Sequence, residues 1–225
     1  ASVGKHEAIS FPDESPEKSL RILTDNSKKF LEHDASNLKS IHDVIRTLDQ
    51  SPDYSKIGGA VAFAVTIASL ESAAKALDKP LFQLISKEKE YRFPFPLGNI
   101  LGGGAHAGPG TPDIQEILIC AIGSKSIRDA IETDLAVHKE LRNVLQKEDP
   151  DFTNGRGDEG GWAPKLDNEK ALELSANACE NLGYTLGKEV ALGVDFASST
   201  QWNDQSKMYE YKRGGFENSP EKQNQ

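Results

Sequence analysis

The first part of the chain has the hydrophobic spacing of amphipathic helices. The pair Ser15-Pro16 is typical of a helix start, and the apolar residues after it fall on one helical face, at Leu20, Leu23, Phe30 and Leu31. A second helix is predicted from about Ser36, with the same spacing at Leu38, Ile41, Ile45 and Leu48. Residues 60–77 are apolar on most sides, so they predict a buried helix that ends before Asp78-Lys79-Pro80.

From Phe93 the pattern changes to short apolar runs typical of strands, PFPLGNIL and IQEILICAI. The connection between them, residues 102–113, is rich in glycine and proline and has no helical period. Parallel neighbours normally need a helical crossover, so these two strands are predicted to be antiparallel neighbours.

Two further helices are predicted at about Ser126–Gln146 and Asp167–Leu182, the second with Asp167 as N-cap and Gly183 as stop. A strand, ALGVDF, and a polar hairpin, WNDQSKMYEYKR, follow. The order of elements predicts a small, mostly helical leading domain at 1–90 and the first three strands of an α/β barrel at 91–225.

Composition argues against several classes of binding partner. The chain has 35 acidic against 26 basic residues and a formal net charge of -9, so it offers no basic field for nucleic acid. Its two cysteines, Cys120 and Cys179, form neither a zinc motif nor a disulfide framework, which favours a reducing, cytoplasmic setting. The longest apolar stretch, residues 60–68, is shorter than the roughly 20 residues of a membrane span, so no membrane partner is expected.

Strand direction predicts where the chemistry lies. Gln115 and Glu116 stand at the start of the second strand, whereas Asp195 stands near the end of the third. If the second strand is antiparallel, these ends and the His106 loop share one rim, the catalytic rim of such barrels. Asp195 would suit Mg²⁺ as a hard oxygen ligand. Glu116 and Glu159 would form a carboxyl pair in which one member keeps a proton and can donate it.

Each of these candidate site residues could also have a purely structural role. An aspartate at a strand end is more often a turn or cap residue than a metal ligand, so Asp195 alone decides little. Glu159 lies in an acidic, glycine-rich loop and could simply be solvated, and His106 could be an ordinary loop histidine. His138 follows Ile131 and Leu135 on one helix face and is predicted to be structural. The stretch GGGAHAGPG lacks the GK[ST] ending of a phosphate loop.

The order of five motifs makes the pattern specific. ASVGKHEA resembles the mobile loop ASTGxxEA of enolases, and GGGAHAG resembles that family's GGSHAG. The pair Gln115-Glu116 matches the family's QE pair, GDEGGWAP resembles GDEGGFAP, and GVDFASS resembles GMDVAAS. The chain therefore resembles an enolase, a Mg²⁺-dependent lyase of glycolysis and gluconeogenesis that reversibly dehydrates 2-phosphoglycerate to phosphoenolpyruvate. The implied fold is the helical part of an α+β N-terminal domain followed by the start of an enolase-type β/α barrel.

The resemblance also implies roles. Glu159 would be the proton donor, Glu116 would support it, and both His106 and Gln115 would contact substrate. Asp195 would be the first magnesium ligand, and Ser2 would close over a second ion. The complete protein would be a homodimer.

The chain is expected to be truncated at both ends, because it opens on a loop-like sequence and stops in a polar run, ENSPEKQNQ. The base lysine and the two other magnesium carboxylates that the resemblance implies have no positions in its 225 residues. Alone it is therefore expected to be inactive. Two alternatives remain, a non-catalytic enolase-fold binding or scaffold protein and a related dehydratase acting on a different acid.

Overall fold

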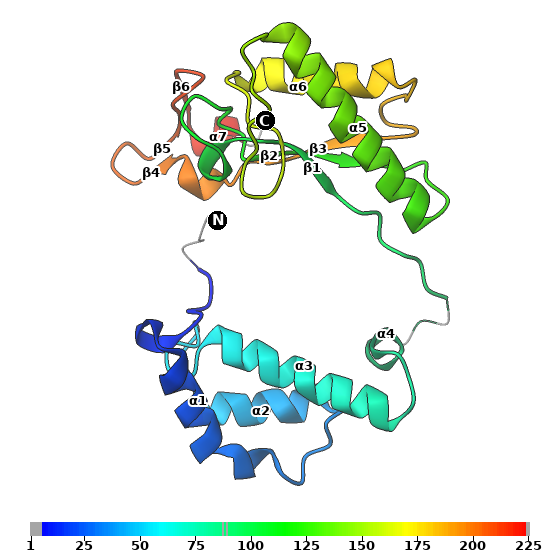
Figure 1. The fold of residues 1–225 in the computed structure, drawn as a ribbon. Coiled ribbons are helices and arrows are strands. Elements are labelled where there is room, and N and C mark those ends of the chain that lie inside the picture. Colours follow the sequence, from blue (N-terminus) through cyan, green and yellow to red (C-terminus); the bar gives the residue numbers. More distant parts are fainter. Residues whose placement is uncertain (1–5, 87, 89, 224–225) are drawn as a thin grey trace. The chain divides into compact units, whose positions relative to one another are not determined.

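The computed structural model describes residues 6–86, 88 and 90–223. These residues form two compact units that divide between Tyr91 and Arg92, and each unit is described by itself (Figure 1). The expectation for Ser2 falls outside the described residues.

The first unit is helical, as its hydrophobic spacing predicted. It contains the 3-10 turns η1 (Pro12–Glu14) and η2 (Ser27–Phe30) and the helices α1 (Pro16–Asp25), α2 (Leu38–Leu48), α3 (Gly59–Ala76) and α4 (Leu81–Ile85). Ser15 caps α1 by accepting a hydrogen bond from the Lys18 N–H, and Asn37 caps α2 in the same way from Ser40. A small core of Ile41, Ile45 and Ala62 joins α2 to α3.

Two expectations for this unit are wrong. The helix predicted after Ser15-Pro16 is present as α1, but it ends at Asp25, so Phe30 and Leu31 do not share its face with Leu20 and Leu23 as predicted. The helix predicted to be buried, α3, is also largely exposed, with Phe63 at 69%. Within the described residues α1, α2 and α4 cover only part of its surface. By length and composition alone, α3 could also cross a membrane, and it is the one described helix of which this is true.

The second unit is built on an antiparallel sheet. Its strands β1 (Gly98–Gly102), β2 (Glu116–Cys120) and β3 (Ala191–Asp195) lie in the order β1-β2-β3, and both neighbouring pairs are antiparallel. The predicted reversal of the second strand is therefore confirmed. The first strand begins later than predicted, since Pro94 and Pro96 have no N–H to donate to a ladder.

Helices α5 (Ile127–Glu148) and α6 (Asn168–Asn181) lie over one face of this sheet (Figure 1). Asp167 caps α6 by accepting from the Lys170 N–H at 2.8 Å, and Gly183, at φ +80°, ends it, both as predicted. The core between helices and sheet contains Ile117, Ile119, Leu141 and other fully buried apolar residues.

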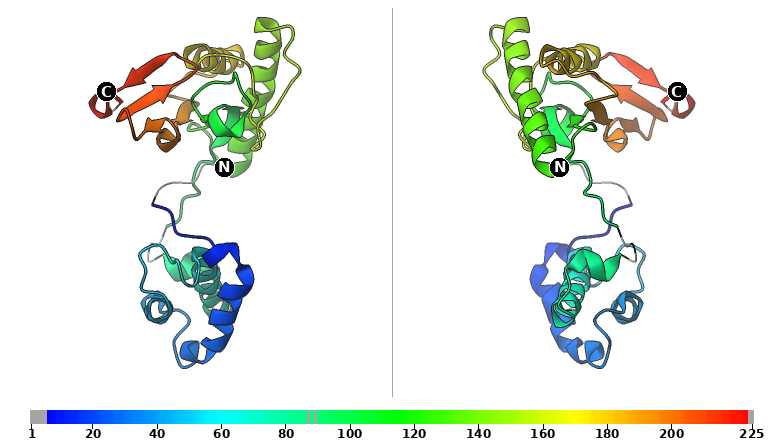
Figure 2. Two further views of the ribbon diagram at one scale, coloured as in Figure 1. Left: turned by 90° about the vertical axis from the view of Figure 1, so that its left-hand side faces the viewer. Right: turned by 90° about the vertical axis from the view of Figure 1, so that its right-hand side faces the viewer.

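The predicted polar hairpin is part of a second, three-stranded sheet. Its strands are β4 (Trp202–Asn203), β5 (Met208–Tyr211) and β6 (Phe216–Asn218), and helix α7 (Pro220–Gln223) follows them. This small sheet and α5 lie on opposite sides of the unit (Figure 2). The 3-10 turns η3 (Gly104–His106) and η4 (Ser198–Thr200) follow β1 and β3, so both lie at the same edge of the main sheet. The fold is mixed α/β with an open sheet, consistent with part of a barrel.

Candidate functional site

Strand register places three sequence positions at one edge of the main sheet. Glu116, the first residue of β2, pairs with Gly102 at the end of β1 and with Asp195 at the end of β3. The loop that carries His106 begins directly after Gly102. The antiparallel course of β2 therefore brings Glu116, Asp195 and the His106 loop to one edge, as the glycine and proline content of that loop predicted.

His106 and two glutamates form a tight cluster at this edge. The His106 Nδ1 lies 3.1 Å from the Glu116 Oε1 and 3.6 Å from the Glu159 Oε2. In spite of these short distances, the His106 Nδ1 has no hydrogen-bond partner among the described residues. The Asp158 Oδ1 lies 3.8 Å from the same ring nitrogen. The His106 side chain is 4% exposed and that of Glu116 13%, whereas that of Glu159 is 47% exposed.

The loop that carries Glu159 packs directly on the His106 loop. The Asp158 N–H donates to the His106 carbonyl at 3.2 Å. A Cβ atom on Gly157 would lie 2.5 Å from that carbonyl oxygen, and one on Gly161 would lie 2.4 Å from the Asn99 Oδ1. Only glycine permits these approaches, so Gly157 allows the two loops to meet and Gly161 allows the Glu159 loop to approach strand β1.

The far end of the Glu159 loop is anchored to the outer edge of β1. The Trp162 N–H donates to the Ile100 carbonyl at 3.1 Å, and the Gly102 N–H donates to the Trp162 carbonyl at 2.9 Å. The Asn99 amide Nδ2 on the same strand donates to the Glu159 Oε2 at 3.3 Å. Strand β1 therefore holds both the backbone of this loop and its glutamate.

Glu116 is electrostatically unusual. Burial, the hydrogen bond with Glu159 and the charges of Glu159 and Asp195 raise the pKa of Glu116 to about 7, and the nearby His106 only partly opposes them. Two carboxyl groups so close cannot both ionise easily. The arrangement can therefore hold one proton between Glu116 and Glu159 near neutral pH.

Asp195 is exposed at the end of β3, and its Oδ1 accepts the Ala197 N–H at 2.8 Å. This is the turn role that remained open from the sequence, but it uses only one carboxylate oxygen. The second oxygen can serve Mg²⁺, which takes hard oxygen ligands, often one or two protein carboxylates with waters. The His106, Glu116 and Glu159 group is also compact enough for a metal, with its ligand atoms within 4.8 Å of one another. A nitrogen donor and a protonated carboxyl suit Mg²⁺ poorly, so Asp195 fits this ion better.

Gln115 is 5% exposed, and its side-chain Oε1 has no hydrogen-bond partner among the described residues. Its backbone carbonyl accepts the Gly103 N–H at 2.8 Å, which fixes the residue beside the His106 loop. A buried amide oxygen without a donor costs free energy unless a ligand or water supplies one.

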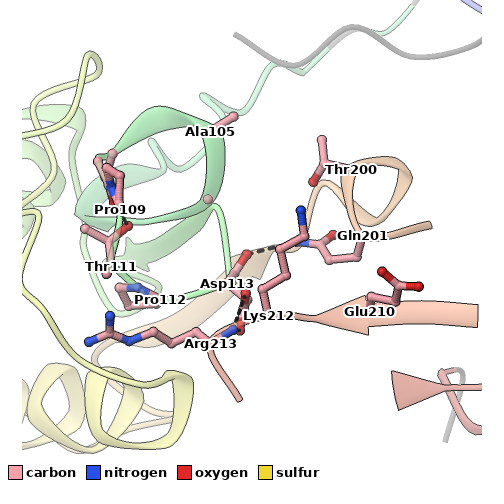
Figure 3. A pocket seen from close by; sticks show the side chains of 14 residues that line it. Ala105, Pro109, Thr111, Pro112, Asp113, Thr200, Gln201, Glu210, Lys212 and Arg213 are labelled. Carbon is pink, nitrogen blue, oxygen red and sulfur yellow. Dashed lines mark hydrogen bonds between the residues drawn. The ribbon is translucent and has the colours of Figure 1, made fainter. Parts of the chain in front are cut away.

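A cavity of about 630 Å³ lies beside the same His106 loop (Figure 3). Its lining comes from residues 104–113 of that loop, except His106, and from Thr200, Gln201, Glu210, Lys212 and Arg213. The Asp113 carboxylate accepts the N–H groups of Arg213 and Gly214 at 3.0–3.1 Å, and its carbonyl accepts the Gln201 Nε2 at 2.9 Å. These bonds tie the small sheet to the loop. None of His106, Glu116, Glu159 and Asp195 lines this cavity, so the cavity is separate from the cluster of His106 and the two glutamates.

Sequence reasoning missed several contacts of the site. The Asn99 amide reaches Glu159, and the Asp158 carboxylate approaches His106. Neither residue was assigned a role from the sequence, although Asp158 belongs to the motif GDEGGWAP. The reason given for His138 was wrong, since Ile131 and Leu135 on the same helix face are 46% and 62% exposed. His138 instead contacts the Glu159 loop.

Comparisons with known proteins agree with the motif order. The family model of the enolase C-terminal TIM barrel domain matches residues 90–225, and that of the enolase N-terminal domain matches residues 1–85. Relatives named enolase include one from Methanosphaera stadtmanae, 39% identical over 99% of this chain and 54% of its own length. A second relative, from Methanothermobacter thermautotrophicus, is 38% identical over 95% of this chain and 51% of its own length. A third, from Pyrobaculum aerophilum, is 35% identical over 99% of this chain and 53% of its own length.

The chain spans about half the length of the curated relatives that it matches. The two family models together cover nearly all of it, and the order of their domains is the order of the two units in the structure. The chain belongs to the enolase family.

Proposed function

We propose that this chain supplies the acid side of an enolase active site, in an enzyme that reversibly dehydrates 2-phosphoglycerate to phosphoenolpyruvate. The observation that carries the proposal is the partly buried carboxyl of Glu116, with a raised pKa, beside the more exposed Glu159. Expelling hydroxide from a neutral carbon requires a proton donor, and this pair can hold that proton near neutral pH. The assignments 1–90 and 91–225 as separate domains belong to the same proposal.

Each residue has a distinct part in the proposed reaction. Glu159, half exposed at the rim, gives its proton to the departing hydroxyl, so that the carbon–oxygen bond breaks and water leaves. Glu116 supports that proton from its buried position. His106 closes on the substrate. The Gln115 Oε1, which has no partner among the described residues, accepts a hydrogen bond from the substrate.

Asp195, with Ser2 for a second ion, would hold magnesium in this proposal. When bound there, Mg²⁺ would supply concentrated positive charge beside the carboxylate of the substrate. The base is a lysine that the family resemblance places outside these 225 residues. The complete protein is proposed to be a cytoplasmic homodimer with a small-molecule substrate.

The test is Glu159→Gln in the full-length parent enzyme, with Glu132→Gln on the exposed surface of α5 as the matched control. Removing the acid should slow phosphoenolpyruvate formation by about 10²- to 10⁴-fold. Exchange of the substrate C2 proton with deuterated water should continue, because the base performs that step. The control should retain both rates. Unchanged dehydration in Glu159→Gln, or equal loss of exchange and dehydration, would contradict the role.

The 225-residue chain by itself should show no magnesium-dependent turnover of 2-phosphoglycerate, since the base lysine and two metal carboxylates come from elsewhere in this proposal. The measurement compares the purified chain with the full-length enzyme at equal concentration. Robust turnover by the chain alone would overturn this division of the site. Binding of substrate without turnover by the full-length protein would favour a non-catalytic member of the family.

A further inference from the structure

We propose that His138 is a positioning residue that fixes the Glu159 loop through a hydrogen bond to the carbonyl of Gly160. The inference rests on the proposed acid role of Glu159. His138 lies on α5, and its Nε2 is 3.1 Å from the Gly160 oxygen. Gly160 directly follows Glu159, so this contact joins a rigid helix to the peptide beside the proposed acid.

The partner of the ring decides its chemical form. A carbonyl oxygen only accepts, so the Nε2 of His138 must carry the proton. Burial lowers the pKa of His138, and the nearby charges of Arg156 and Arg142 lower it further, against the effect of the Gly160 hydrogen bond. The ring is therefore a neutral Nε2–H imidazole at neutral pH, and it can keep donating to the loop.

Trp162 locks the imidazole in place. The two rings stack with centroids 4.7 Å apart and planes 21° apart, and the Trp162 Nε1–H donates to the backbone carbonyl of His138 at 2.8 Å. The Arg156 guanidinium lies 4.4 Å from the Trp162 ring centroid, and Phe152 meets that ring edge to face. Trp162 of the Glu159 loop thus fixes the His138 ring, and that ring in turn binds the Gly160 carbonyl of the same loop.

Gly160 is where such an anchor has the most effect. Its φ of +85° lies in the region that glycine adopts freely, and a Cβ there would meet open space. On its far side the loop is fixed by the Trp162 backbone bonds to β1. Without the His138 donor, the peptide after Glu159 can rotate between these fixed points and move the carboxyl away from Glu116.

The experiment compares His138→Phe with His138→Gln in the full-length enzyme. Phenylalanine keeps a ring to stack on Trp162 but has no donor, whereas glutamine keeps a donor. We expect kcat to fall about five- to tenfold in His138→Phe, the effect of one lost hydrogen bond, with KM changed less than twofold. His138→Gln should recover most of the loss. The matched control is His42→Phe, a histidine of the first unit whose ring contacts Thr66.

Amide hydrogen exchange provides a readout independent of activity. The Gly157, Asp158 and Gly160 amides are bonded within the loop or to His106, whereas the Trp162 amide is bonded to β1. Exchange of the first three should quicken in His138→Phe while that of Trp162 stays slow. A merely structural loss would quicken Trp162 and α5 as well.

Nitrogen NMR of the wild-type ring tests the same contact if His138→Phe does not fold. The account requires a neutral Nε2–H tautomer at pH 7. An Nδ1–H tautomer, an imidazolium, wild-type kcat in His138→Phe, or an equal defect in a folded His138→Gln would each overturn the proposal. Failure of the acid role would instead appear as unchanged dehydration in Glu159→Gln, with the tautomer and the exchange pattern of the loop still as described.

Discussion

Two carboxylates, the buried Asp49 of the first unit and the partly buried Glu116 of the second, have pKa values shifted in opposite directions. Asp49 is fully buried, yet its pKa is lowered: burial acts to raise it, but the Ser51 hydroxyl and the N–H groups of Ile57, Ser51 and Lys56 outweigh burial. Those three N–H groups donate at 2.8–2.9 Å. Glu116 is less buried, but it lies beside Glu159 and Asp195, and its pKa is raised to about 7.

The difference shows that hydrogen-bond donors, rather than burial alone, decide what a buried carboxylate does. Asp49 ties the segment after α2 to its end and stays ionised, so it serves stability. Glu116 has acids for neighbours and keeps a proton, so it suits proton transfer. Substitutions at the two positions should therefore have opposite consequences for activity and stability.

The largest expected effect is on activity, in Glu116→Gln of the full-length enzyme. We expect kcat to fall by about 10²- to 10³-fold, because the pair loses the carboxyl that supports the Glu159 proton. Stability at pH 8 should not fall. The folded-state pKa of Glu116 is raised, so its ionisation disfavours folding as pH rises through about 7, and glutamine removes that cost. Steady-state kinetics and urea unfolding at pH 8 measure both effects. A destabilised Glu116→Gln with normal kcat would reverse the comparison.

Asp49→Ala should do the opposite. Losing the carboxylate leaves buried N–H groups without an acceptor and should destabilise the first unit by about 2–4 kcal/mol, with little change in kcat. The folded-state pKa of Asp49 is lowered, so its stabilisation is present above the usual pKa of 3.8 and is lost as pH falls through the folded-state value.

The measurement for Asp49→Ala is exchange of the Ile57 amide, which donates to Asp49. Asp53→Ala is the control, since Asp53 accepts from the nearby Ser55 N–H but is partly exposed. It should leave the Ile57 amide protected. Equal exchange in both variants would show that the Asp49 contacts do not stabilise the unit.

A third carboxylate, Asp134 on α5, sharpens the comparison with a smaller effect. It is 8% exposed, and its Oδ1 has no hydrogen-bond partner among the described residues. Burial raises the pKa of Asp134 to about 6. The contribution of Asp134 to the free energy of unfolding is therefore fully present below the usual pKa of 3.8 and is lost as pH rises through about 6.

Asparagine does not ionise, so Asp134→Asn should remove this dependence of stability on pH. The variant should be about 1–3 kcal/mol more stable than wild type at pH 7.5. Urea unfolding at several pH values checks this, with the exposed Glu132→Gln on the same helix as control. A pH dependence identical to wild type would mean that an unseen partner satisfies Asp134.

The predictable parts of this molecule depend on local chemistry. A loop rich in glycine and proline cannot be a crossover helix, which was enough to predict the reversal of β2 and to place Glu116 and Asp195 at one rim. Their direct pairing is a finding of the structure. The Asp167 cap and the Gly183 stop are equally local.

The features that the sequence did not predict depend on tertiary contacts. The exposure of α3 could not be read from its composition, because an apolar helix gives no sign of how much of its surface is covered. The contact of His138 with Gly160 joins residues 22 positions apart through a glycine loop of no regular period. Asp49 is satisfied by backbone N–H groups seven and eight residues later, which no side-chain pattern reveals.

The most direct test is a carbon NMR titration of the Glu116 carboxyl in the metal-free, full-length enzyme, alone and with Glu159→Gln. A proton held between Glu116 and Glu159 requires a midpoint near 7 that moves toward the usual value of 4.5 when Glu159 loses its charge. A midpoint near 4.5 in both proteins would mean that the two glutamates do not share a proton.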